Sequence, residues 1–123
     1  MSRPGVGGQA TVEVALALPL VAVVLLVVLQ IALVERDAVA LTAAARAAAR
    51  RVMVDPGVAG ARDAAVRETR LDARRLSVTV SGDTAVGGYA TVVVRYRSPT
   101  DVPLVGSFVG DVELGERFVV LRE

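Results

Sequence analysis

The chain has no cysteine, histidine, lysine or tryptophan, and its only aromatic residues are two Tyr and two Phe. Without cysteine there is no disulfide, thiolate nucleophile or cysteine-based metal site, and without histidine the commonest general base and metal ligand is missing. The absence of lysine excludes a Schiff-base lysine and a P-loop lysine. A formal net charge of +1 argues against a nucleic-acid partner held by bulk charge. We therefore expect no enzyme, metal site or cofactor, and no nucleic-acid partner.

One long apolar run dominates the sequence. Residues 14–34 contain no charged residue, and fifteen of these 21 residues are Val, Leu or Ile. A helix of this length is about 32 Å long, close to the hydrocarbon thickness of a bilayer. The fifteen residues favour insertion by about 5–9 kcal/mol, which Pro19 and Gln30 reduce but do not reverse. The run predicts a membrane-spanning helix in contact with lipid.

Two other interpretations of the apolar run are weaker. A buried core helix would need more chain to cover it than this protein has. A cleaved secretory signal could use the Ala-rich stretch 43–49 as its cleavage site. However, the run is longer than the usual apolar region of about 7–15 residues. It also follows an acid, Glu13, where such a signal has a cluster of basic residues.

The helix is expected to continue well beyond the apolar run. Residues 38–54 are rich in Ala, the best helix former, and the first breaker is Pro56 followed by Gly57. One helix should therefore cover residues 9–54, a length of about 67 Å. Its second half places Arg46, Arg50 and Arg51 beside small Ala faces that another layer could cover closely.

Residues 55–123 predict a small α+β head. Residues 55–57 predict a turn that also offers a helix start, with Asp55 as the cap and Pro56 as the first residue. Residues 61–73, in which charged residues alternate with Ala, predict a short amphipathic helix. Period-two alternation predicts three antiparallel strands, and the apolar residues of a long connection between the last two are expected to fold back onto the core. The strands are 76–81, 90–97 and 112–122, with a bulge at Gly115, and the connection is 98–110 with Leu104, Val105, Phe108 and Val109. These 69 residues form a thin core, so the sheet should pack on the second half of the long helix.

The N-terminal edge of the apolar run carries a processing pattern. Gly8 stands directly before Gln9, and Glu13 is the fifth residue after that glycine, a spacing typical of type IV prepilins. Glu13 lies four residues, about 6 Å, along a helix from the amine that cleavage would create on Gln9, and on the same face. A carboxylate that enters an apolar bundle needs a cation, and the amine of an axially shifted neighbour can supply it.

Two motifs in the first 50 residues resemble a known family. Residues 10–20 are similar to the opening of TadE-like minor pilins, in which Pro follows Glu by six positions, as Pro19 follows Glu13. Residues 44–50 resemble the family's Ala-Ala-Arg-x-Gly-Ala-Arg segment through Arg46 and Arg50, with Ala48 in the glycine position. The closing residues 121–123 are a looser match. The chain departs from many relatives in having Val14 where an aromatic residue is common, and in lacking a cysteine pair.

The resemblance implies a function in pilus assembly. TadE-like minor pilins, or pseudopilins, belong to the tight-adherence, Flp-type IVb pili of bacteria. The expected partners are other pilin subunits, pilus assembly membrane proteins and a membrane-embedded prepilin peptidase, which would remove residues 1–8. The expected location is the inner membrane, crossed once, with the head outside the cytoplasm or incorporated into pili, and the expected role is adhesion or surface secretion. The alternative is an unprocessed, single-pass membrane-anchored interaction module.

The distribution of basic residues does not favour that orientation by itself. The positive-inside rule predicts that the side of the span with more arginine lies in the cytoplasm. Arg3 stands before the span, whereas four arginines follow it closely: Arg36, Arg46, Arg50 and Arg51. Two acids, Glu35 and Asp37, and the length of the head weaken this objection.

The charged residues of the head allow two further interpretations. Asp111 and Glu113, with Asp101 nearby, share a strand face and could bind a cation, but a solvated strand face is the simpler interpretation. A group of arginines could bind anionic lipid or polysaccharide, against the simpler interpretation of a solvated helix face. These arginines are Arg62, Arg67, Arg70, Arg74 and Arg75.

Overall fold

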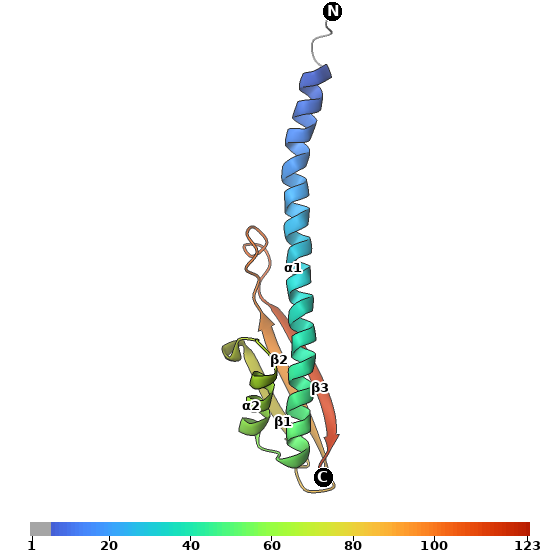
Figure 1. The fold of residues 1–123 in the computed structure, drawn as a ribbon, viewed down its shortest axis with the longest axis vertical. Helices are drawn as coiled ribbons and strands as arrows, with labels where there is room; N and C mark the ends of the chain where they lie inside the picture. Colours follow the sequence, from blue (N-terminus) through green and yellow to red (C-terminus); the bar gives the residue numbers. More distant parts are fainter. Residues whose placement is uncertain (1–5) are drawn as a thin grey trace, which may run out of the picture.

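The computed structural model describes residues 6–123 and shows one long helix with a small head at its C-terminal end (Figure 1). Helix α1 covers Val6–Val54, about 73 Å of continuous helix. It ends where the Pro56 breaker predicts, but it begins three residues before Gln9. Gly7 and Gly8 therefore lie in its first turn, where glycine weakens a helix without preventing it. The hydroxyl of Thr11 donates a hydrogen bond of 2.9 Å to the Gly7 carbonyl in this turn.

The segment after α1 differs from the prediction. Asp55 does not cap the second helix; its carboxylate accepts a hydrogen bond of 3.0 Å from the Gly57 amide and one of 3.1 Å from Arg51. These contacts close the turn, so helix α2 begins later, at Val58, with Gly57 as its cap residue. Helix α2 covers Val58–Glu68 and is followed by a short 3₁₀ helix, η1, at Ala73–Arg75. Compared with the expected range 61–73, α2 begins three residues earlier and ends five residues earlier.

The three predicted strands form one antiparallel sheet in the order β1-β2-β3. The strands are β1 Leu76–Gly82, β2 Tyr89–Ser98 and β3 Val112–Leu121. The bulge expected at Gly115 is absent, because Gly115 pairs with Arg95 in a continuous one-to-one register along β2 and β3. The extended backbone accepts glycine there without an extra residue. Gly82 is different, since its φ of 95° and the nearby Tyr89 carbonyl leave no room for a side chain.

The core lies between one face of the sheet and the C-terminal half of α1. This packing was predicted because residues 55–123 have too few large side chains for a core of their own. Alanines supply much of the helix surface in this layer, so the helix and sheet backbones approach closely. Residues of α1 that belong to the core are Leu41, Ala44, Ala45, Ala48, Ala49 and Val52. Helix α2 adds Ala61 and Ala65 on the same face of the sheet. The fold is therefore the expected α+β arrangement: a long apolar helix and a three-stranded antiparallel head, as in pilins.

The connection between β2 and β3, residues 99–111, does not fold back onto the core. It extends from the head along α1 toward the N-terminal half of the helix (Figure 1, orange). Leu104 and Phe108 in this loop are 59% and 88% exposed. The expectation was wrong because α1 already fills the inner face of the sheet, so the loop has no core surface left to cover.

The last residues of the chain stabilise the end of α1. The Arg122 guanidinium donates hydrogen bonds of 3.3 and 3.1 Å to the carbonyls of Val52 and Met53. The Glu123 amide also donates to the Met53 carbonyl at 3.2 Å. The final carbonyls of a helix lack partners within the helix, and a cation there complements the helix dipole. The loosely matching C-terminal residues therefore have a clear structural role.

Candidate functional site

The N-terminal half of α1 is an exposed apolar rod. Every side chain at residues 7–25 is exposed, and Leu16, Leu18 and Leu20 are each more than 60% exposed. Helix α1 from Gly7 is long and apolar enough to cross a membrane. So much exposed apolar surface requires lipid or neighbouring helices around it. The rod is therefore suited to be the membrane anchor of the chain.

The predicted processing and assembly residues lie near the tip of this rod. Gly8 and Gln9 are in the first turn of α1, and Glu13 lies one helical turn beyond Gln9 on the same side. All three are exposed, and Glu13 is the only charged residue between Arg3 and Glu35. The first five residues of the expected leader, Arg3 included, lie outside the described residues. The tip thus presents one carboxylate on an apolar helix surface.

Pro19 lies within α1, six residues after Glu13. Proline has no N–H, so it leaves the carbonyl four residues earlier, that of Ala15, without its usual helical donor. Both residues are exposed on the rod. An unpaired carbonyl in an apolar surrounding is costly, so this turn of the rod has a weaker helix and an acceptor that a neighbour could satisfy.

The two arginines of the family motif lie far from this tip. Arg46 is 33 residues beyond Glu13, about 50 Å along the helix. Arg46 and Arg50 are both exposed, whereas Ala48 between them is fully buried against the head. The motif therefore combines a buried small residue, which permits close packing, with two outward charges. Arg50 also lines a shallow groove between α1 and α2.

Sequence reasoning missed the polar side chains that attach the head to α1. Gln30 is 6% exposed, and its side-chain amide makes a long hydrogen bond of 3.5 Å to the Pro99 carbonyl. The Thr42 hydroxyl donates to the Glu116 carboxylate at 3.0 Å. The sequence spacing could have revealed this contact. Gln30 lies seven residues before Asp37, and both lie on the same helix face as Leu41 and Ala48, which packs against the head.

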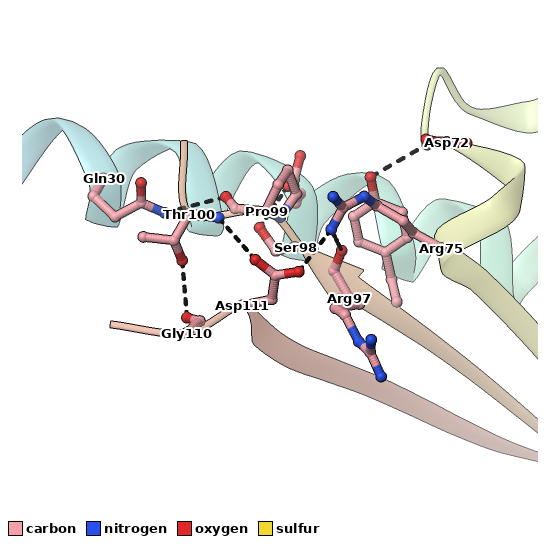
Figure 2. Close-up of polar contacts among 11 residues, drawn as sticks. Gln30, Asp72, Arg75, Arg97, Ser98, Pro99, Thr100, Gly110 and Asp111 are labelled. Atoms are coloured by element: carbon pink, nitrogen blue, oxygen red, sulfur yellow. Dashed lines mark hydrogen bonds and ion pairs between the residues drawn. The ribbon is translucent and has the colours of Figure 1, made fainter. Parts of the chain in front are cut away.

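A polar cluster holds the base of the β2–β3 loop (Figure 2). Arg75 donates to the Asp111 carboxylate at 2.9 Å, and the Thr100 amide donates to the same carboxylate at 3.3 Å. The hydrogen bond from Arg75, and then that from Thr100, lower the pKa of Asp111 below its ordinary value. The same pairing with Asp111 raises the pKa of Arg75. The Thr100 hydroxyl donates to the Gly110 carbonyl at 3.0 Å, so both ends of the loop are joined.

Several acids and arginines of the head form ion pairs with each other. Asp111 contacts Arg75, and Glu113 lies 3.8 Å from Arg95, so both acids of the suggested cation site already face a guanidinium. Within residues 6–123 there is no cluster of three metal-ligating side chains. Three arginines of the suggested anion site have acceptors in the head: Arg62 at the Ala73 carbonyl, 2.8 Å; Arg67 at Asp63, 2.9 Å; and Arg75 at Asp111.

These features are a small α+β head on one long helix whose exposed apolar half is suited to anchor it in a membrane. Residues 8–50 match the model of a family described as TadE-like protein. The match covers the exposed rod and the Ala-rich face that carries the head, and it confirms the resemblance of both motifs. The chain is therefore similar to TadE-like proteins over residues 8–50. Comparison with curated proteins and with solved structures finds no significant match.

Proposed function

We propose that the chain is a TadE-like minor pilin, or pseudopilin, which the prepilin peptidase cuts between Gly8 and Gln9. It takes part in the assembly of tight-adherence, Flp-type IVb pili, and so in adhesion or surface secretion, without being an enzyme. It crosses the bacterial inner membrane once, with the head outside the cytoplasm. The observation that carries the proposal is a lone carboxylate, Glu13, on an exposed apolar helix, one turn beyond the new amine.

The electrostatics favour a pairing between subunits. A carboxylate among apolar helices loses its hydration, and it is stabilised only by a cation nearby. The amine of Gln9 on an axially shifted neighbour is such a cation. At a separation of 4 Å and an effective dielectric constant of about 20, the attraction is about 4 kcal/mol before desolvation. Because desolvation cancels part of this gain, the pair chiefly fixes the axial position of one helix relative to the next.

The local structure is compatible with cleavage. The bond between Gly8 and Gln9 lies in the first turn of α1, where backbone N–H groups have no helical partner. Gly7 and Gly8 each disfavour the helix by about 1 kcal/mol relative to alanine. A peptidase therefore needs little free energy to unwind this turn and reach the bond.

The test uses two matched glycines. A Cβ on either Gly7 or Gly8 would meet nothing within 4 Å, so Gly7→Val and Gly8→Val are equally free of clashes in the folded chain. Mass spectrometry of the mature wild-type protein should find Gln9 at the N-terminus, methylated as in similar pilins. Gly8→Val should remain uncut, while Gly7→Val should still be cleaved.

The second candidate is an unprocessed, membrane-anchored interaction module. One observation favours it: α1 is continuous from Val6 through Gly8, so residues 6–8 of the expected leader belong to the same helix as the anchor. A mature N-terminus at Met1 or Ser2, in cells with active prepilin peptidase, would establish this alternative and refute the minor pilin.

A further inference from the structure

We propose that the β2–β3 loop is a second membrane-contacting element, whose tip inserts beside α1 into the lipid leaflet on the side of the head. The first observation is its position along the helix. The loop residues Val105 and Val109 line an apolar groove together with Val27, Ile31 and Val34 of α1. Those three helix residues belong to the uncharged run 14–34. A helix that crosses a bilayer through this run therefore places the loop tip inside the leaflet.

The depth agrees with that of known interfacial segments. Val27 lies seven residues before Val34, the last apolar residue of the run, which is about 10 Å along the helix. Segments that lie in the membrane interface bury their apolar faces by about 5–10 Å. Figure 1 shows the loop reaching alongside α1 well beyond the edge of the sheet.

The composition of the loop suits lipid. Residues 102–110 carry no charge, and Asp101 and Asp111 stand immediately on either side. Within the tip, Phe108 is 88% exposed, so neither α1 nor the sheet covers the largest side chain of the loop. Leu104 is 59% exposed, and its φ of 69° is uncommon for a bulky residue. The loop thus points large apolar side chains outward, at the level along α1 where the proposed bilayer would surround them.

The polar groups change over at the same level on the loop and on the helix. Asp111 is bound to Arg75 at the base of the loop, on the side of the head (Figure 2). On α1 the first charged residue after the apolar run is Glu35, which lines the mouth of the same groove. Beyond this level, toward the N-terminus, both surfaces are apolar, and Ile31 beside the loop is 56% exposed. A bilayer edge at this level separates the polar groups from the apolar groups on both elements.

The loop also explains the polar residue in the apolar run. Gln30 is 6% exposed beneath the loop, and its amide contacts the Pro99 carbonyl. Without the loop, the side-chain nitrogen of Gln30 would lose its contact with Pro99 and the whole amide would face lipid, which is costly. The loop therefore shields Gln30 from lipid and presents its own apolar tip in its place.

The experiment uses the absence of tryptophan from the chain. The full-length Phe108→Trp variant, reconstituted in vesicles of phosphatidylethanolamine and phosphatidylglycerol, carries one tryptophan as a reporter. Its emission should shift to the blue, and lipids brominated on their acyl chains should quench most of it. Val86→Trp is the matched control, because Val86 is 75% exposed in the β1–β2 turn at the other end of the head. Its tryptophan should emit as in water and remain unquenched.

A third variant, Leu18→Trp, reports on the rod and should be quenched strongly. If Leu18→Trp is quenched and Phe108→Trp is not, the loop lies in water and the proposal is wrong. A blue shift of Phe108→Trp without quenching by brominated lipid would mean that a second copy of the chain covers the loop, which also overturns it. An unquenched Leu18→Trp would overturn the proposal together with its membrane premise. None of these outcomes depends on cleavage after Gly8 or on pilus assembly.

Discussion

The hydroxyl of Ser98, at the end of β2, donates a hydrogen bond of 2.7 Å to the carboxylate of Asp37 on α1. Ser98 is fully buried, so this contact joins the head to the helix at the point where α1 leaves the apolar run. Thr42 and Glu116 form a second polar contact between helix and head, with Thr42 five residues, about 7.5 Å, beyond Asp37 on α1. Together the two bonds set the rotation of α1 against the sheet, which apolar contacts with alanine define poorly.

Removing this hydroxyl should destabilise the head. In Ser98→Ala the half-buried Asp37 carboxylate loses its donor, and a hydrogen bond to a charged group is worth about 1.5–3 kcal/mol. We expect the free energy of unfolding to fall by that amount in a urea titration of the protein in detergent. Ser77→Ala, an exposed serine on β1, should change it by less than about 0.5 kcal/mol. Equal effects of the two substitutions would contradict the role of Ser98.

The head should need the second half of α1 to fold. A fragment that starts at Asp55 lacks six of the fifteen buried residues of the core, Leu41 and Val52 among them. It also lacks the Val52 and Met53 carbonyls that Arg122 contacts. We expect no cooperative thermal transition from this fragment, whereas one that starts at Asp37 should unfold cooperatively in circular dichroism. Equal transitions for both fragments would show that docking is unimportant.

The Arg75–Asp111 pair should make the stability of the loop base depend on pH. The pKa of Asp111 is lowered in the folded protein, so its pairing stabilises the fold above the pKa of an unfolded aspartate and is lost as the pH falls through the folded value. We therefore expect wild type to melt above Asp111→Asn at pH 7, and the difference in melting temperature to shrink as the pH falls below the pKa of an unfolded aspartate and to vanish once Asp111 is protonated in the folded protein. Asp101→Asn, an exposed neighbour, should follow wild type at each pH. A difference that persists at low pH would exclude the ionised pair as its source.

Substitution of Glu13 distinguishes a pilin from a plain membrane anchor. An anchor needs only apolar length, so Glu13→Ala should still insert and should still be cleaved after Gly8. If Glu13 meets a partner's amine, the same variant should fail to co-purify with pilin subunits and should not join pili. Glu13→Asp should be intermediate, because its shorter side chain carries the charge less far from the helix. Glu35→Ala, which removes the exposed acid at the other end of the run, is the control and should assemble normally.

The outcome for Glu13→Ala bears on the whole assembly hypothesis. If this variant assembles and supports adherence like wild type, the carboxylate does not set the position of the helix in the filament. Glu13 would then be a residue of the lipid headgroup layer, and the minor pilin function would rest on cleavage after Gly8 alone.

The residue pattern along the chain is enough to predict the kinds of secondary-structure element and their order. The uncharged run 14–34 and the Ala-rich stretch after it required one long helix, and period-two alternation placed three strands close to their observed bounds. These properties are local, because residues that are one period apart along a helix or a strand lie on the same face and share the same environment. The spacing of Gly8, Gln9 and Glu13 is likewise a property of the chain, and the helix carries it unchanged.

The contacts of the isolated polar residues and the course of the long loop depend on how the helix and the sheet pack together. In the sequence, Gln30 is only a polar interruption of an apolar run. In the structure it is buried and contacts Pro99, which is 69 positions away along the chain. The β2–β3 loop extends along α1 because the helix occupies the sheet face that the loop would otherwise cover. The contact of Ser98 with Asp37 arises in the same way. Such contacts have no period along the chain, since they depend on how separate elements pack, and packing is settled only when the whole core closes.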